Sequence, residues 1–190
     1  NEYFVAWTTT PWTLPGNVGL AVHPSAKYVR VQSGDELLWF AKDRAPEGLS
    51  VVKEVVGSEL VGESYVPLFN YLPVGSQKSY VIIPAEFVTM EDGTGIVHTA
   101  AIYGEDDYTV SVKECLPTIP MLDDQGIFLP FVTDLAGQYY LKTQPWIIDD
   151  LTSRNLIYKS EMGSHSYPFC YRCGTALFYN ALPAYFINIQ

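Results

Sequence analysis

The chain has 190 residues, enough for one substantial domain, and its 48% hydrophobic and 17% charged residues are typical of a globular, water-soluble protein. Its net charge is −10 and its eleven Lys and Arg residues are scattered singly, which argues against broad contact with a nucleic acid backbone. No apolar run is long enough to cross a bilayer, no signal peptide is present, and three cysteines are too few for a disulfide scaffold. We therefore expect a cytoplasmic protein without membrane association.

Short runs rich in aromatic and β-branched residues predict β-strands along most of the chain. Turn-forming residues separate these runs, as in Ser33–Glu36 and Glu91–Gly95. The predicted strands are Tyr3–Thr8, Val18–Val22, Tyr28–Gln32, Leu37–Phe40, Val51–Val56, Tyr80–Ile83 and Gly95–Thr99. Many short strands with such spacing are typical of a barrel or a sandwich.

Two segments are predicted to be helical, one from about Glu105 to Leu116 and one from Pro145 to about Asn155. Acidic residues fill the first turn of the first segment, where the helix dipole favours negative charge, and proline is a favoured first residue of a helix. Apolar residues at helical spacing predict the buried face of each helix. These are Tyr108, Val112 and Leu116 in the first, and Ile147, Ile148 and Leu151 in the second.

The last part of the chain differs in character, because it is rich in aromatic residues and holds the C-x-x-C sequence. We therefore divide the chain into a main domain over residues 1–162 and an appended segment over residues 163–190. The chain starts without Met and both of its ends are strand-like, so we expect it to be a piece of a longer protein.

Three consecutive threonines, Thr8, Thr9 and Thr10, end the first predicted strand, and Pro11 stops the strand ladder because it has no N–H. Each hydroxyl can donate and accept a hydrogen bond, so such an array can hold the polar edge of a ligand or orient a water. Threonine is also a good strand former, so the residues alone leave a purely structural role open.

His98 ends a predicted strand, and Asp107 lies in the first turn of the helix that follows. A strand–loop–helix unit allows both side chains to face one pocket. Histidine can bond a hydroxyl or transfer a proton near neutral pH, and a carboxylate in a pocket can hold an ammonium group. The alternative is a structural histidine and a carboxylate that caps its helix.

Cys170 and Cys173, followed by a glycine, have the spacing of one zinc knuckle. A structural zinc needs four ligands, of which His165 is a candidate third, whereas Cys115 lies far away in sequence. The pair is predicted to be half of a zinc site or two packed thiols. Signatures of a phosphate-binding loop, a serine nucleophile and a zinc protease are absent, so any hydrolysis would use directly oriented water.

Two motifs together resemble a known family. The stretch WTTTPWTLPGNVGLAVHP and the later DGTGIVHTA and GEDDY are similar to the editing domain inserted into class I isoleucyl-tRNA synthetases. The segment HSYPFCYRCGTALFY is similar to the part that leads back to the catalytic domain, so the resemblance spans nearly the whole chain. Valyl enzymes typically carry TTRPET and a lysine in place of His98, and leucyl enzymes carry TTRPDT. This chain has the isoleucyl form.

The resemblance implies a mainly β fold, with a closed β-barrel core decorated by a few α-helices. It implies hydrolysis, by directed attack of water, of valine misattached to isoleucine tRNA, with valyl-adenylate as a second substrate. The implied partners are the 3′ end of that tRNA and the rest of the synthetase chain, which binds ATP. No cofactor is implied for this chain, and we expect a monomer.

The resemblance also assigns roles by position. Asp107 would hold the α-ammonium of the amino acid, the three threonines would orient the ester and its water, and His98 would contact the ribose or the side-chain end. Trp12 would shape the wall that excludes isoleucine, and Asn17 would support it. The implied catalytic residues are Thr8, Thr9, Thr10, His98 and Asp107. The implied substrate-binding residues are Trp12, Asn17, His98 and Asp107.

One position departs from the family's pattern, because relatives usually have Ala-Pro where this chain has Ala100 and Ala101. This leaves the shape of the loop between the histidine and the aspartate open. Glu105 and Asp106 are expected to cap the helix that follows.

In many relatives, the partner cysteines of the C-x-x-C lie just before the editing insertion. Cys170 and Cys173 are therefore predicted to form a half site that is empty in this chain, with zinc bound only in the full-length enzyme. Two alternative functions stay open from the sequence. One is a non-catalytic module that binds the aminoacylated tRNA end, and the other is editing of the valyl or leucyl type.

Overall fold

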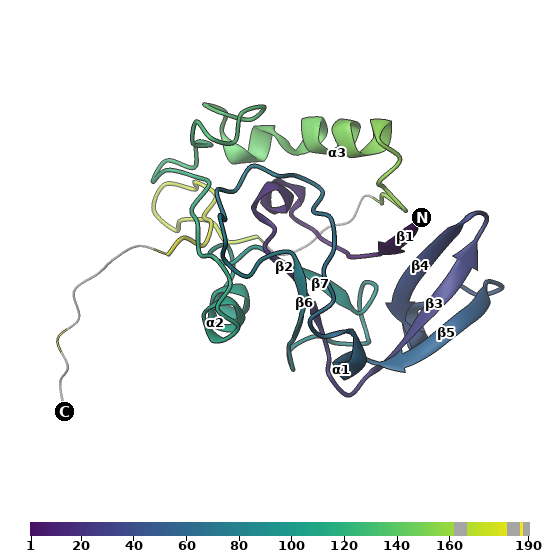
Figure 1. The fold of residues 1–190 in the computed structure, drawn as a ribbon. Helices are drawn as coiled ribbons and strands as arrows, with labels where there is room; N and C mark the ends of the chain where they lie inside the picture. The colour runs from purple at the N-terminus through teal and green to yellow at the C-terminus, as the bar shows by residue number, and fades with distance from the viewer. Residues whose placement is uncertain (162–166, 182–186, 188–190) are drawn as a thin grey trace.

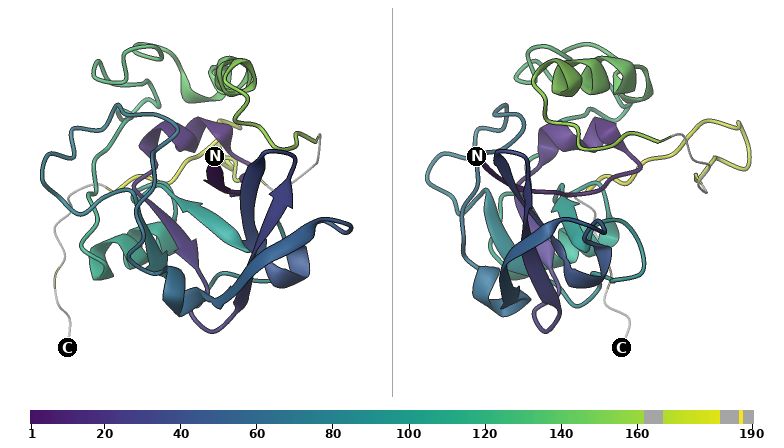
Figure 2. Two further views of the ribbon diagram at one scale, coloured as in Figure 1. Left: turned by 45° about the vertical axis from the view of Figure 1, so that its right-hand side comes forward. Right: turned by 90° about the vertical axis from the view of Figure 1, so that its right-hand side faces the viewer.

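The computed structural model describes residues 1–161, 167–181 and 187. Two β-sheets lie below a helical layer (Figures 1 and 2). The strands are β1 (Glu2–Phe4), β2 (Gly19–Val22), β3 (Lys27–Ser33), β4 (Glu36–Ala41), β5 (Ser50–Val56), β6 (Val81–Pro84) and β7 (Ile96–Thr99). The α-helices are α1 (Gly57–Leu60), α2 (Glu105–Lys113) and α3 (Gln144–Ser153). The 3-10 helices are η1 (Pro11–Gly16), η2 (Lys42–Arg44) and η3 (Tyr140–Lys142).

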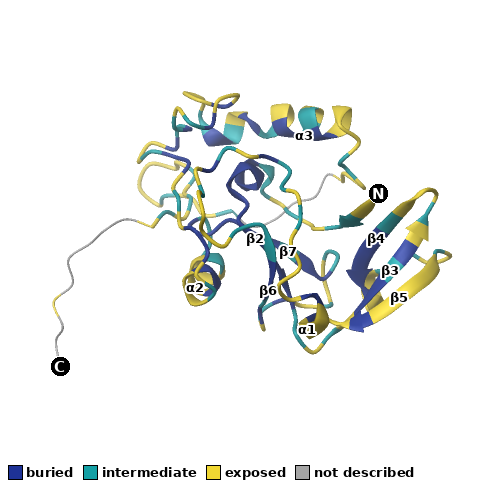
Figure 3. Ribbon diagram, viewed as in Figure 1, coloured by how far each residue is buried: buried dark blue, intermediate teal, exposed yellow. Residues whose placement is uncertain are grey.

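The larger sheet has the order β1-β4-β3-β5, with β1 parallel to β4 and the other neighbours antiparallel. The β3–β4 hairpin turns through Gly34 and Asp35, where Gly34 has a φ of 58° that a two-residue hairpin loop requires. The predicted turn at this position is confirmed. β5 is an edge strand whose outer side, including Val51 and Val52, is exposed (Figure 3).

The smaller sheet has the order β6-β2-β7. β2 runs parallel to β6 and antiparallel to β7, and Leu20 pairs with His98. All four residues of β2 are buried because this strand lies in the centre of its sheet. The buried central strand fixes the position of His98 on its neighbour.

A shared buried apolar cluster, which includes Tyr28 and Trp39 of the larger sheet and Leu20 and Ile96 of the smaller one, joins the two sheets, and individual backbone contacts add to it. After β1 the chain leaves the larger sheet, and Trp7 forms a parallel bridge with Val97 of β7. The Ala41 N–H donates to the Thr94 carbonyl at 2.9 Å, which ties the end of β4 to the start of β7. The bridge at Trp7 explains why the threonine run, which follows it directly, meets the strand that carries His98.

The prediction of a closed β-barrel is wrong. Among the described residues the strands form two separate sheets, and β1 and β5 are the edges of the larger one. Closure requires continuous pairing around a ring of tilted strands. Here the smaller sheet has strands of four residues. Its outer sides pair with short segments outside the named strands, through the bridges Trp7 to Val97 and Ser64 to Val81 and through backbone hydrogen bonds between residues 62–65 and 80–82.

All seven predicted strands are present, although the first ends at Phe4 instead of Thr8. Both predicted helices are present as α2 and α3, and α3 begins one residue before Pro145. The buried face of α3 is confirmed for Ile147 and Leu151, while Ile148 is half-buried. The short helices α1 and η1 were not predicted from the sequence.

The predicted buried face of α2 is wrong, because Tyr108 and Val112 are 44% and 54% exposed. The buried residues of the helix are Val110 and Ser111. They lie three and four residues after Asp107, whose carboxylate is bonded to the end of β7 and so turns that side of the helix inward. Leu116 is buried, but it follows the helix after a left-handed residue and does not continue its face.

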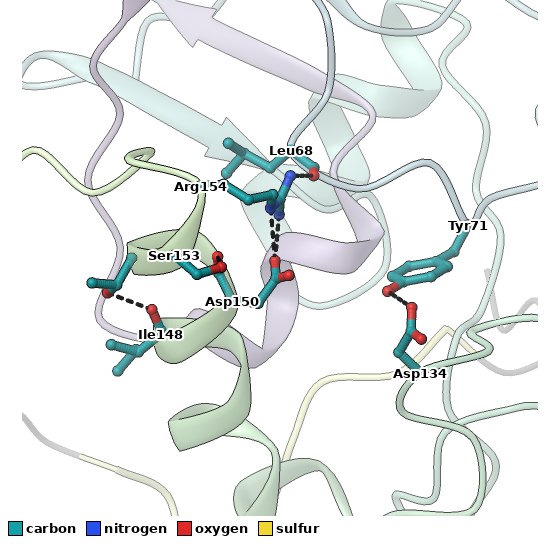
Figure 4. A network of polar contacts seen from close by, with 8 residues as sticks. Leu68, Tyr71, Asp134, Ile148, Asp150, Ser153 and Arg154 are labelled. Carbon is teal, nitrogen blue, oxygen red and sulfur yellow. Dashed lines mark hydrogen bonds and ion pairs between the residues drawn. The ribbon is translucent and has the colours of Figure 1, made fainter.

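The helical layer is tied to the surrounding loops by polar contacts (Figure 4). Arg154, just after α3, donates to the Leu68 carbonyl at 2.9 Å and to the Asp150 carboxylate. The Tyr71 hydroxyl donates to Asp134 at 2.5 Å. η1 lies between α3 and the smaller sheet, so the turn that follows the threonines is covered on both sides (Figures 1 and 2).

Within the described part of the chain, no helix has the length and apolar character that a membrane span requires.

Candidate functional site

The threonine run forms a compact turn at the start of η1. The Thr8 hydroxyl oxygen accepts the Thr10 N–H at 3.0 Å. The Thr10 carbonyl accepts both the N–H of Thr13 at 3.0 Å and its hydroxyl at 2.8 Å. Pro11 favours this geometry because its fixed φ suits the first helical position and its missing N–H would have no partner there. The hydroxyls of Thr8 and Thr10 lie 3.4 Å apart at the mouth of the turn.

His98 lies beneath this turn and is only 8% exposed. The Asn17 side-chain nitrogen donates to the Gly19 carbonyl and to His98 Nδ1, at 2.9 and 3.1 Å. Since Nδ1 accepts a hydrogen bond, the ring proton sits on Nε2, which lies 2.8 Å from the Thr13 hydroxyl oxygen. Burial lowers the pKa of His98 to about 4, so the ring is neutral at physiological pH.

Asp107 lies in the first turn of α2, beside the end of β7. Its Oδ1 accepts the Ala100 N–H at 3.0 Å. Burial is the main cause that raises the pKa of Asp107 to about 6, and the backbone bonds only partly oppose it. The carboxylate is therefore ionised at neutral pH, but burial makes its charged form less favourable. A nearby ammonium group would offset this desolvation penalty.

The residue before α2 must stay small for this carboxylate to keep its place. A Cβ added at Gly104 would lie 2.3 Å from Asp107 Oδ2. The loop that leads there is held by the Tyr103 N–H, which donates to the Ala100 carbonyl at 2.9 Å, and Ala101 is buried in it. The loop therefore has a defined turn without the proline that relatives usually carry.

The opposite pKa shifts of Asp107 and His98 give a testable pH dependence of stability. The pKa of Asp107 is raised, so its contribution to stability is present at low pH and is lost as pH rises through about 6. The pKa of His98 is lowered, so its contribution is present above its ordinary value of 6.5 and is lost as pH falls towards about 4. Between about pH 4 and 6, the Asp107 contribution to stability therefore falls with rising pH while the His98 contribution rises.

Asp107→Asn removes the pH dependence that Asp107 contributes to stability and keeps a side-chain oxygen that can accept the Ala100 N–H. The free energy of unfolding of this variant, minus that of the native chain, should rise by about 2–3 kcal/mol between pH 4 and 6. Urea unfolding at a series of pH values measures this difference. A difference that stays constant over that range would contradict the raised pKa.

Trp12 is buried in an aromatic cluster beneath η1. Its ring meets those of Tyr140 and Tyr103 edge to face, with centroids 4.6 and 5.2 Å away, and Phe178 lies further out at 6.4 Å. Such pairs add about 0.5–1.5 kcal/mol each beyond the area that they bury. The cluster makes the turn after the threonines rigid.

A hollow of about 230 Å³ lies beside the threonine run. It is mostly apolar, with the side chains of Thr9 and Thr10 at one wall. The other lining residues come from η3, α3 and the appended segment, and are Leu141, Gln144, Tyr167, Phe169 and Ala176. A small apolar hollow next to hydroxyl groups suits a short aliphatic side chain carried on a polar ester.

The structure thus joins Thr8, Thr10, Asn17 and His98 in one network through Thr13 and places Asp107 just after the same strand, whereas Thr9 is exposed and lines the hollow. Glu105 and Asp106 are exposed in the first turn of α2, and the N-cap residue is Gly104, which has no side chain for a capping hydrogen bond, so the role expected of these two acids stays a prediction.

Two members of the network, Thr13 and Tyr65, were not predicted from the sequence. Thr13 stands three residues after Thr10, a spacing that the 3-10 turn brings together, so the motif itself contained a signal. Tyr65 bonds Asn17 from a loop far away in sequence, and nothing in the sequence points to it.

Cys170 and Cys173 lie on a tight turn in the appended segment. The Gly174 N–H donates to the Cys170 carbonyl at 2.9 Å, and an antiparallel bridge from Phe169 to Ala176 closes the turn. His165, the candidate third ligand, lies outside the described residues. Within the described ranges no group of three or more possible metal ligands is found, so the zinc half site stays a prediction.

Comparison with known proteins identifies the family. No family model matches the chain. The isoleucine–tRNA ligase of Clostridium novyi is 44% identical over 193 residues, which cover 100% of this chain and 18% of that protein. That of Bdellovibrio bacteriovorus is 40% identical over 196 residues, covering 98% of this chain and 19% of the relative. The chain is a segment of the isoleucine–tRNA ligase family.

Solved structures show which fold this isoleucine–tRNA ligase segment has. The structure named GlLeuRS-CP1 matches it with a TM-score of 0.63 at 19% identity, covering 85% of each chain. The editing domain of the P. knowlesi cytosolic leucyl-tRNA synthetase matches with a TM-score of 0.57 at 13% identity, covering 95% of this chain and 84% of that one. The ligase segment therefore has the fold of a synthetase editing domain.

Proposed function

We propose that this chain is the proofreading domain of an isoleucine–tRNA ligase and hydrolyses valine that is misattached to isoleucine tRNA. The hydrophobic pocket in which a synthetase selects its amino acid can distinguish side chains that differ by one methylene by only about 1–3 kcal/mol. The standard example of this limit is the selection of isoleucine over valine by isoleucyl-tRNA synthetases. A second site that hydrolyses the smaller product supplies the missing accuracy. The observation that carries the proposal is the threonine turn, which is hydrogen-bonded to His98 on β7, together with the partly desolvated carboxylate of Asp107, which is bonded to Ala100 just after the same strand.

In this proposal Asp107 binds the α-ammonium group of the amino acid. A half-buried carboxylate with a raised pKa gains from a positive partner, and a charge-assisted hydrogen bond gives that partner a fixed direction. Valyl-adenylate carries the same ammonium group, so it is a second substrate of the same site.

The hydroxyls of Thr8 and Thr10 and the exposed Thr9 orient the ester and the attacking water. His98 is neutral, and both of its ring nitrogens bond protein groups. In this geometry His98 orients the threonine turn. To make the predicted contact with the ribose or with the end of the substrate's side chain, His98 would have to break its hydrogen bond to Thr13 or to Asn17. Hydrolysis then follows from positioning of water, without a covalent intermediate.

The specificity proposed here is a size filter. The hollow beside Thr9 and Thr10 takes the valine side chain, and the rigid turn over Trp12 keeps its wall from yielding to the larger isoleucine. Asn17 supports this wall through its bond to His98.

The partners in this proposal are the 3′ end of isoleucine tRNA carrying valine and the remainder of the ligase chain. The chain spans about 18% of the length of the relatives that it matches. In this proposal, the remainder of the ligase binds the body of the tRNA. The negative net charge fits a domain that holds only the terminal nucleotide. A monomer, a cytoplasmic location and a division at residue 162 stay predictions.

A direct assay tests the proposal. Val-tRNA(Ile) and Ile-tRNA(Ile) are incubated separately with this chain, and loss of the labelled amino acid is followed over time. We expect fast release of valine and little release of isoleucine. Equal release of valine and isoleucine, or release of neither above the spontaneous rate, would contradict the proposal. If the chain released a misattached amino acid faster from leucine tRNA than from isoleucine tRNA, editing of the leucyl type would be favoured.

A further inference from the structure

A tryptophan directly before the threonine run has an exposed ring. Trp7 is 54% exposed, whereas Trp12 and Trp39 are each only 3% exposed. A single exposed aromatic residue is common on protein surfaces, so its position must decide its role. Trp7 has a fixed position, because its backbone forms the parallel bridge to Val97 and the chain continues from it into the threonine turn.

One side of the Trp7 side chain rests on the turn that precedes β7. A Cβ added at Gly93 would lie 3.1–3.3 Å from Cβ, Cγ and Cε3 of Trp7, so the glycine allows this close approach. The turn is itself held by Arg44, which donates to the carbonyls of Gly93 and Glu91 at 2.9 and 3.2 Å. The indole therefore has a fixed support, and the rest of its surface is open to solvent.

Three features of the site follow one another along β7 and its end. Trp7 pairs with Val97, and the threonine turn is hydrogen-bonded to the next residue, His98. The Asp107 carboxylate accepts the N–H of Ala100, two residues further on. From Val97 to Ala100 an extended chain spans about 10 Å.

An aminoacyl ester of a nucleoside is of similar length and carries its groups in a matching order. Its ammonium group lies at one end, the ester and the ribose lie in the middle, and the base lies at the other end. The proposed function places the ammonium group at Asp107 and the ester at the threonines. The base then falls at the end where Trp7 lies.

Stacking on an aromatic ring suits the charge of this chain. A net charge of −10 disfavours broad contact with phosphates, whereas a base stacks on an aromatic ring without any positive charge on the protein. An unpaired base at the end of a strand has both faces free for such a contact.

We propose that Trp7 is the platform on which the terminal nucleobase of the aminoacylated tRNA stacks. The inference rests on the proposed function, because the positions of the ester and the ammonium group are taken from it. Stacking accepts any base, so Trp7 contributes affinity and orientation of the ester, and it does not read the identity of the base.

Two probes that cannot be hydrolysed test this inference. The first is valine joined by an amide to 3′-amino-3′-deoxyadenosine, and the second is the same amide on a sugar without a base. Equilibrium dialysis with labelled valine measures the affinity of this chain for each probe. The native chain should bind the probe with a base about tenfold more tightly, within the range for stacking on one aromatic ring.

Variants assign this difference to one residue. Trp7→Ala should bind both probes equally, and Trp7→Phe should keep most of the difference because it keeps an aromatic ring. Trp146→Ala is a matched control, since Trp146 is a 36% exposed residue on α3 whose ring packs against Phe69. It should keep the native difference between the probes.

Equal native affinity for the two probes would overturn the inference without any variant, which covers the case that Trp7→Ala fails to fold. A difference that survives in Trp7→Ala, or is lost in Trp146→Ala, would also overturn it. Survival in Trp7→Ala would favour the remainder of the ligase as the partner of the exposed ring.

Release of valine from Val-tRNA(Ile) separates this inference from the proposed function. If the native chain releases valine but binds both probes equally, only the role of Trp7 fails. If it releases no valine but prefers the probe with a base through Trp7, the proposed hydrolysis fails and the platform stands. If it releases no valine and binds neither probe, both fail.

Discussion

Replacing Asp107 with alanine should slow the release of valine from Val-tRNA(Ile) about a hundredfold or more. The carboxylate is the group at the site that is both ionised at neutral pH and partly desolvated, so it is the proposed partner of the substrate's ammonium group. A hundredfold loss corresponds to about 2.7 kcal/mol, which lies in the range for removing one member of a desolvated charge pair. Single-turnover release of labelled valine measures it.

Two further variants separate the charge from the fold. Asp107→Asn retains an acceptor for the Ala100 N–H but has no charge, so it should lose nearly as much activity as the alanine variant. Asp106→Ala removes an exposed acid from the same helical turn and should leave the rate unchanged within a factor of two. If Asp107→Asn keeps the native rate, the carboxylate does not bind the ammonium group and the proposed mechanism is wrong.

Replacing Gly95 with alanine should lower the free energy of unfolding by about 3 kcal/mol. Gly95 precedes β7 and has a φ of 73°, a left-handed conformation that costs about 1–2 kcal/mol for a residue with a Cβ. The added Cβ would also lie 2.3 Å from the Cβ of Ala41, at the junction of the two sheets. Urea denaturation, with the midpoint and slope fitted together, measures the loss.

The two causes can be measured apart. Gly34 has a φ of 58° and open space where a Cβ would point, so Gly34→Ala should cost only the conformational part, about 1 kcal/mol. In a double-mutant cycle, Ala41→Gly should recover part of the loss in Gly95→Ala, because it removes the atom that clashes. A Gly95→Ala variant no less stable than Gly34→Ala would show that the sheets separate freely at this point.

The local pattern of residues predicted the secondary structure well, because the strands alternate with clear turn signals. The hairpin at Gly34 and the start of η1 at Pro11 follow from residues that restrict the backbone in known ways. The position of His98 and Asp107 at one strand end was also predictable, since nine residues of strand, loop and helix leave few other arrangements.

Features that depend on contacts between distant segments were not predictable in the same way. The face of α2 was misjudged because the helix is oriented by the hydrogen bond that the Ala100 N–H donates to the Asp107 carboxylate, which its apolar periodicity does not reveal. The closed barrel was inferred from strand number and spacing, neither of which determines whether edge strands meet. The hydrogen bond from the Tyr65 hydroxyl to Asn17 depends on a loop whose path no local pattern specifies.

The parallel bridge between Trp7 and Val97 has a consequence for how the chain acquires its activity. It joins segments roughly ninety residues apart in sequence. Bringing them together costs loop-closure entropy, and this must happen before any hydrogen bond between the threonine turn and His98 can form. Neither motif alone holds a site, and a chain with only one sheet in place has none. Under the proposed function, hydrolysis of an aminoacyl ester would therefore require both segments to be in place.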